Sequence, residues 1–287
     1  MNKYTYFSIV SAITLVSCSG SVNNNNNNIN NDSIVEDIIQ NENIDKDMEH
    51  ASKVLNTLPE AHEIISILLD HPDTKYDASA LNSDKLNSKY TTTISKALNI
   101  GIYGTDMSYA SLFEQNQTVL KYMAAIKIMA DELGILQFFD EETMRNMEEN
   151  LCNKETMIEL ITNAYYSSDK YLIESGQREI ASLIISGAWV EGMYTAFYLS
   201  KSSYSLNPNL SSRILKQCLD IPILLEFFEN TSDSNFIEIK KDFEDIKSLT
   251  DSANIKQLDN GLYSCDEKYF KKLYDKVLEV RKRYVAI

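Results

Sequence analysis

Apolar residues recur at helical spacing along most of the chain after residue 33, and this periodicity is the strongest constraint on its fold. The segment 115–133 shows it clearly, because its apolar residues repeat every three or four positions along one face. Alternating β-branched runs between hairpin turns are missing, and eight Gly with four Pro give little material for tight turns. We therefore predict an all-α fold, a multi-helix bundle of about eight to ten helices.

One segment of the predicted bundle, residues 180–199, carries a single charge, Glu191, and is apolar almost all round. Its length and composition resemble those of a membrane span. A central carboxylate is expensive in lipid, however, and the segment's serines and threonine suit a helix buried in a bundle. We predict that a helix near residues 178–200 forms the buried centre of the fold.

A long polar stretch, Asp73 to about Lys89, shows no sustained period and is the longest candidate loop. It is rich in Asp, Asn and Ser, which favour turns over helix interiors. Long loops on a rigid scaffold often carry function, so this stretch is a region of interest.

The first seventeen residues have the character of a secretion signal, with Lys3 as the only charge and an apolar run over residues 7–16. The string Leu-Val-Ser-Cys at 15–18 fits the lipobox of bacterial lipoproteins. It predicts cleavage before Cys18, a diacylglycerol on the Cys18 sulfur and an acyl group on the new amino terminus. A plain signal peptide and an uncleaved anchor are the alternatives.

Residues 18–32 follow as a polar run that includes six consecutive asparagines, Asn23–Asn28, and has almost nothing to bury. We interpret this run as a flexible tether between the lipidated Cys18 and a single all-helical domain at residues 33–287. The expected location is the bacterial cell envelope, in the outer membrane, with the domain in the periplasm or at the cell surface.

Charge and cysteine content exclude several classes of partner and site. The net charge of −15 argues against nucleic acid and against electrostatic adhesion to anionic lipid. The three cysteines that remain after Cys18 are widely spaced, and no histidine pair has metal-ligand spacing, so we predict no metal site. Hydrolase elbows, phosphate-binding loops and dinucleotide fingerprints are also missing, which leaves no predicted cofactor and no catalytic residue.

The last stretch, residues 266–287, is the one basic part of the chain, with seven Lys or Arg against four acids. A helical face of this kind is usually solvated, and we interpret it in that way.

Two predicted helices, residues 97–113 and 180–199, share an unusual pattern. Each contains two glycines, which cost about 1 kcal/mol apiece relative to alanine in a helix interior. Each also carries a single acid, three residues before a tyrosine. Another interaction must offset this cost, and we therefore expect the two helices to make contacts that only glycine allows. The residues concerned are Gly101, Gly104, Asp106 and Tyr109 in the first helix and Gly187, Glu191, Gly192 and Tyr194 in the second.

Two accounts explain this pattern. In the first, the glycines allow two central helices to pack closely, and the acids bond to neighbouring hydroxyls, amides or helix ends. In the second, the glycine faces leave room for a ligand, and acids in such apolar surroundings would have raised pKa values. The candidate ligand-binding residues of that pocket are Tyr103, Asp106, Tyr109, Trp189, Glu191 and Tyr194.

Three sequence blocks, 97–110, 130–135 and 187–194, resemble those of uncharacterised lipoproteins of the Bacteroidota. The similarity would cover roughly residues 55 to 200. This family has no established activity, so the resemblance implies an envelope address and assigns no catalytic residue.

Three functions remain open at this point. The first is a non-enzymatic module that binds another envelope protein or component. The second is a small-molecule receptor that uses a glycine-lined pocket between the helices around 97–113 and 180–199. The third and weakest is an enzyme with Asp106 and Glu191 as its acid and base, since a chain with 42 acids brings some pair together by chance.

Overall fold

The computed structural model describes a defined part of the chain, all of it within one compact unit over residues 41–287. The predicted signal peptide, Cys18 and the tether lie outside the described residues. The described ranges are 75–136, 141–153, 156–157, 159–161, 163–164, 172, 175, 177–200, 207–228 and 234–286.

The fold is all-α, as the periodicity predicts. Eight α-helices occur in the described ranges, together with short 3-10 segments and one two-stranded hairpin. The helices are α3 (Thr93–Leu112), α4 (Asn116–Glu132), α5 (Glu141–Glu149), α7 (Arg178–Leu199), α8 (Pro208–Leu219), α9 (Ile221–Leu225), α10 (Ser234–Ser252) and α11 (Glu267–Tyr284).

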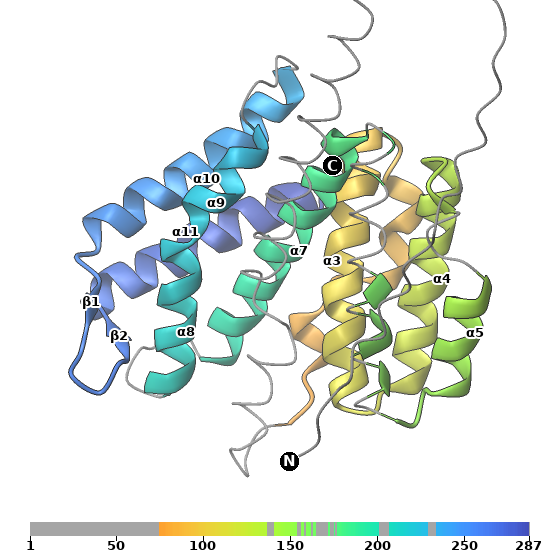
Figure 1. Cartoon of the computed structure of the whole chain (residues 1–287), viewed down its shortest axis with the longest axis horizontal. Helices are drawn as coiled ribbons and strands as arrows, with labels where there is room; N and C mark the ends of the chain where they lie inside the picture. Colours follow the sequence, from red (N-terminus) through yellow and green to blue (C-terminus); the bar gives the residue numbers. More distant parts are fainter. Residues whose placement is uncertain are drawn as a thin grey trace, which may run out of the picture. The chain divides into compact units, whose positions relative to one another are not determined.

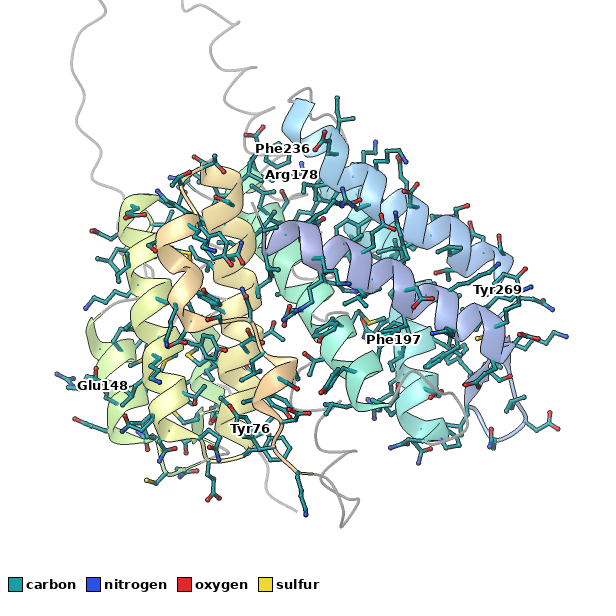
Figure 2. The ribbon with its side chains drawn as sticks, turned by 180° about the vertical axis from the view of Figure 1, so that it is seen from behind. Tyr76, Glu148, Arg178, Phe197, Phe236 and Tyr269 are labelled. Atoms are coloured by element: carbon teal, nitrogen blue, oxygen red, sulfur yellow. The ribbon has the colours of Figure 1, made fainter. Side chains whose placement is uncertain are left out.

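The centre of the bundle is the pair α3 and α7, which share the most extensive helix contact among the described elements. On one side α3 packs against α4, and α5 lies beyond, while on the other α7 packs against α8 and α11 (Figure 1). Helix α10 covers α11, and aromatic side chains fill the seam between α7 and α11. Phe197 of α7, which is labelled in Figure 2, packs against Phe270 of α11 with ring centroids 5.0 Å apart.

Helix α7 is the predicted buried central helix. Among the described residues it is the one helix long and apolar enough to cross a membrane, but 89% of its apolar window is buried inside the bundle. That burial is what a core helix requires, because side chains from α3, α8 and α11 replace water around it.

The glycines at the crossing of α3 and α7 bring the two backbones into direct contact. A Cβ atom at Gly101 would lie 2.0 Å from the Ile184 carbonyl oxygen, and one at Gly187 would lie 1.9 Å from the Leu98 carbonyl oxygen. Real Cβ atoms do not approach oxygen so closely, and here the obstructing atoms belong to the backbone. The close-packing account of the glycine pattern is therefore confirmed at these two positions.

The predicted long loop contains no α-helix from residue 75 onward. It forms two 3-10 segments, η1 (Ala78–Ala80) and η2 (Asp84–Lys89). Asp77 caps the first, with its side-chain oxygen accepting a hydrogen bond from the Ser79 backbone N–H at 2.9 Å. The capping box of Thr92 and Ser95 then starts α3.

A short antiparallel hairpin, β1 (Lys256–Gln257) and β2 (Tyr263–Ser264), interrupts the helices between α10 and α11. The sequence reading missed it because two-residue strands are too short to show an alternating pattern. Gly261, with φ of 84°, supplies the left-handed backbone conformation in its turn.

The backbone contact at the crossing predicts that Gly101→Ala destabilises the fold by about 3 kcal/mol or more, because the added methyl group forces α3 away from α7. The measurement is urea unfolding of the full chain. Gly134→Ala is the matched control: nothing lies within 4 Å of its Cβ position, and its φ of 70° makes the expected loss only about 1 kcal/mol. Equal losses in the two variants would contradict this view of the crossing.

Candidate functional site

A buried ion pair joins the central helix α7 to the C-terminal helix α11. The Arg281 guanidinium donates from Nε to Glu191 Oε2 and from Nη2 to Glu191 Oε1, both at 2.7 Å. The Glu191 side chain has no exposed surface, and that of Arg281 is 11% exposed. The guanidinium also lies 3.9 Å from the centroid of the Tyr194 ring. Glu191 therefore has the close donor that a structural role requires.

Asp106 of α3 lies in the same buried cluster and also has no exposed surface. Its Oδ2 accepts a hydrogen bond from the Asn82 backbone N–H at 2.9 Å. Burial raises the pKa of Asp106 well above its usual range, and the negative charge of Glu191 adds a smaller rise. The positive charge of Arg281 opposes this shift. A proton on Asp106 leaves the cluster with one cation and one anion, which is the electrically balanced state in an apolar interior.

Residues 77–90, here named the strap, lie over this cluster. Side chains of α3 and α4 form hydrogen bonds with the strap's backbone and hold it there. The Asn82 carbonyl accepts from the Tyr122 hydroxyl at 2.6 Å, and the Ser83 carbonyl accepts from the Tyr103 hydroxyl at 2.8 Å. Together with the bond from the Asn82 N–H to Asp106, these contacts satisfy polar backbone groups that the bundle would otherwise bury without partners. Three residues of the strap are buried, and the others whose side chains are described are partly or fully exposed, so the strap is a surface segment tied to the core.

The Asn82 side chain extends this network into the bundle. Its amide nitrogen donates to the Tyr90 hydroxyl at 3.1 Å and to Asn99 Oδ1 at 3.3 Å. Asn99 in turn donates to the carbonyl of Tyr284, the last residue of α11, at 2.9 Å. A single polar network therefore connects the strap with α3 and the end of α11.

The outer end of the strap is held by two tyrosines. The Tyr109 hydroxyl accepts from the Asp77 backbone N–H at 3.1 Å, and the Tyr198 hydroxyl donates to Asp77 Oδ2 at 2.6 Å. The bond from Tyr198 lowers the pKa of Asp77 from its ordinary value. Tyr76 stacks on Tyr109 beside these contacts, with ring centroids 5.6 Å apart.

The structure distributes the six predicted ligand-binding residues over several places. Asp106, Glu191 and Tyr194 meet at Arg281, whereas Tyr103 and Tyr109 hold different points of the strap. Trp189 packs instead against Phe243 of α10, with ring centroids 5.4 Å apart. In the described structure, the polar groups and rings of these six residues contact other parts of the protein. Ligand binding by them stays a prediction.

The sequence reading missed Arg281, which it assigned to a solvated basic face. That interpretation is wrong for this residue, because Arg281 is mostly buried against Glu191. The helical spacing of apolar residues could have identified it. Arg281 lies four residues after the buried Val277 and three before the buried Tyr284, on the same face of the helix. Lys276 is paired as well, with Asp245 of α10 at 3.0 Å.

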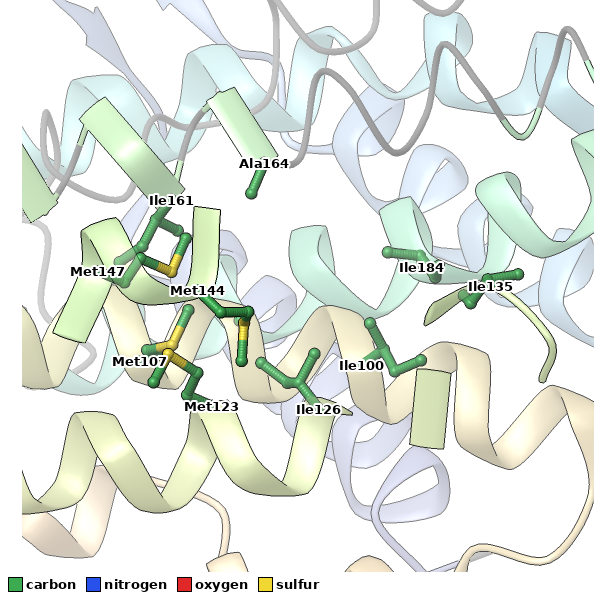
Figure 3. Close-up of a pocket in the computed structure, with 11 residues that line it drawn as sticks. Ile100, Met107, Met123, Ile126, Ile135, Met144, Met147, Ile161, Ala164 and Ile184 are labelled. Atoms are coloured by element: carbon green, nitrogen blue, oxygen red, sulfur yellow. The ribbon is translucent and has the colours of Figure 1, made fainter. Parts of the chain in front are cut away.

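A separate apolar cavity lies on the other face of α3, between α3, α4, α5 and α7 (Figure 3). The cavity has a volume of about 30 Å³, and an empty volume of this size costs roughly 0.7 kcal/mol in an apolar core. Gly104 contributes to its wall, but none of the six predicted residues does. The lining residues are Ile100, Gly104, Met107, Met123, Ile126, Ile135, Met144, Met147, Ile161, Ala164 and Ile184.

These arrangements limit the chemistry that the described residues support. They contain no group of three His, Cys, Asp or Glu side chains placed to hold a metal ion. The charge of Glu191 helps to raise the pKa of Asp106, but both acids are fully buried beneath the strap. Acid and base catalysis by this pair would first require the strap to open.

Comparison of the chain with protein-family models, with curated proteins and with solved structures found no match. The functional argument therefore rests on the residues themselves, and membership of a Bacteroidota lipoprotein family stays an expectation.

The ion pair predicts that Glu191→Leu destabilises the protein by about 3 to 5 kcal/mol, because it leaves the Arg281 charge buried without a partner. Combining it with Arg281→Met removes both charges, and the double variant is expected to be more stable than Glu191→Leu alone. Urea unfolding of both single variants and the double variant measures the coupling. Losses that simply add would show that the two side chains act independently.

The raised pKa of Asp106 predicts a dependence of stability on pH. Above pH of about 4 the unfolded chain releases this proton while the folded chain retains it, so the group's contribution to stability falls as pH rises toward the folded pKa. Asp106→Asn has no proton to release, and its stability relative to the natural chain should therefore rise between about pH 5 and pH 8. The measurement is the free energy of unfolding of Asp106→Asn and of the natural chain across this pH range.

Asp77→Asn is the control for this experiment. The pKa of Asp77 is lowered in the folded state, so its contribution changes below about pH 4 and its difference from the natural chain stays flat between about pH 5 and pH 8. A flat difference for Asp106→Asn as well would show that Asp106 is ionised in the fold.

Proposed function

We propose that this chain is a lipid-anchored protein of the bacterial cell envelope whose helical domain serves as a non-enzymatic binding module. Support for the anchor comes from the sequence: a secretion signal ends in a lipobox at Cys18, and an asparagine-rich run follows. Such a tether would hold the domain away from the lipid surface, in the periplasm or at the cell surface, with the outer membrane as the proposed site.

The observation that carries the binding-module proposal is the fully buried state of Asp106 and Glu191. These are the acids that the sequence singled out, and their oxygens contact Asn82 and Arg281. A catalytic acid and base must reach the atoms they protonate and deprotonate. The partner would be another envelope protein or component, and the net charge of −15 disfavours nucleic acid.

A receptor for small molecules is the second candidate function, and one observation favours it. The apolar cavity lies between α3 and α7 on one side and α4 and α5 on the other, and Gly104 forms part of its wall. Binding sites in helical bundles commonly occupy such positions between helices. This cavity lies away from the acid cluster, so the receptor function does not require the strap to open.

The anchor is tested by expressing the full chain and Cys18→Ser in a bacterium that processes lipoproteins and is fed a labelled fatty acid. We expect the natural chain to carry the label and to sediment with outer membranes, whereas Cys18→Ser loses both properties. Cys152→Ser is the matched control, because Cys152 is an exposed free cysteine outside the lipobox. Label that persists in Cys18→Ser would refute lipidation at this residue.

The binding module is tested by affinity purification of the natural chain from detergent-solubilised membranes. We expect a partner at near-equal molar amount that is lost when the fold is disrupted by Gly101→Ala. Absence of any near-stoichiometric partner would count against a protein-binding role while leaving the anchor result unaffected.

A further inference from the structure

Among the described residues, the wall of the apolar cavity contains no polar side chain, which restricts what can occupy it. The eleven lining residues that the structure describes are all Ile, Met, Ala or Gly. A ligand's carboxylate, hydroxyl or amide would lose its hydrogen bonds to water there and find no side-chain replacement. Water itself is disfavoured in such a site, since apolar cavities remain dry. The part of any ligand inside this cavity must therefore be hydrocarbon.

Four of the nine methionines of the chain gather around this small space. Met107 comes from α3, Met123 from α4, and Met144 and Met147 from α5 (Figure 3). Methionine is unbranched, with three rotatable bonds and a polarisable sulfur, so it adapts to guests of different shape. With about 30 Å³ open before any adjustment, the cavity suits a narrow, linear chain better than a rigid ring.

Helix α5 forms one side of the cavity. It has only nine residues, and helices this short are not stable in isolation. Its packing therefore relies on apolar contacts such as the buried Met147, while Arg145 and Glu149 remain exposed on its other face. A small displacement of α5 would lengthen the cavity without disturbing the α3 and α7 crossing.

From these features we propose that the cavity binds the hydrocarbon end of a free amphiphile, such as a fatty acid, whose polar head remains outside. This inference rests on the proposal that the domain is a binding module, and it names the chemistry of one ligand. The site is separate from the acid cluster, because none of Asp106, Glu191 or Arg281 lines it.

The test is a titration with decanoate, below the concentration at which it forms micelles, followed by NMR of ¹³C-labelled methionine methyl groups. The full chain carries Cys18→Ser, so that no acyl chain of its own competes. We expect saturable shifts in the signals of Met107, Met123, Met144 and Met147. Met129 and Met193 are fully buried elsewhere in the bundle, and their signals should stay unchanged.

A variant pair then tests the location. Ala164→Val adds two carbons to the cavity wall and should weaken decanoate binding at least about tenfold. Ala124→Val makes the same change at an exposed position of α4 and should leave binding unaltered. An affinity that is equal in the two variants would overturn the proposal, as would the absence of saturable shifts or equal shifts at Met129 and Met193.

A parallel titration with phosphatidylcholine vesicles separates free amphiphiles from membrane acyl chains. Shifts caused by vesicles but not by decanoate would overturn binding of a free amphiphile. A protein partner recovered from membranes, together with no response to decanoate, would refute this inference and leave the proposed binding module standing.

Discussion

The close approach of α3 and α7 determines much of the rest of the structure. Gly101 and Gly187 place each helix backbone directly against the other, with no side chain between them. Such contact maximises dispersion between densely packed atoms, and it compensates for the weak helix-forming tendency of glycine. It also brings the one fully buried acid of each helix, Asp106 and Glu191, into the same region, because each acid follows its crossing glycine by four or five residues.

Two acids in an apolar interior would repel each other and lose their hydration, so the fold must neutralise them. Arg281 provides the cation through a bidentate contact with Glu191, and burial favours a proton on Asp106. The strap completes the arrangement by giving Asp106 a backbone N–H donor. The acid cluster thereby fixes the strap, α3, α7 and α11 in one geometry, since each of these elements contributes one member of the network.

The two faces of α3 are chemically different, and this difference guides the functional argument. Toward the strap and α11 it presents polar groups with defined partners. Toward α4 and α5 it presents Ile100, Gly104 and Met107, whose packing leaves space. A polar network of this kind is rigid because each lost bond leaves a buried group unsatisfied, whereas methionine contacts adjust at little cost. Adaptable binding is therefore better suited to the cavity than to the acid cluster.

The sequence by itself determined the all-α class and the burial of the helix near residues 178–200, and it singled out Gly101 and Gly187 as positions that need an unusual contact. These properties are local, because helical periodicity and glycine spacing are written within one or two turns of chain. Only the tertiary structure decided that Glu191 pairs with Arg281, ninety positions away. It also decided that the polar strap lies over the acid cluster and that the cavity forms where separate helices meet. Such contacts depend on how whole helices pack, and helical periodicity identifies a buried face without specifying which distant residue will meet it.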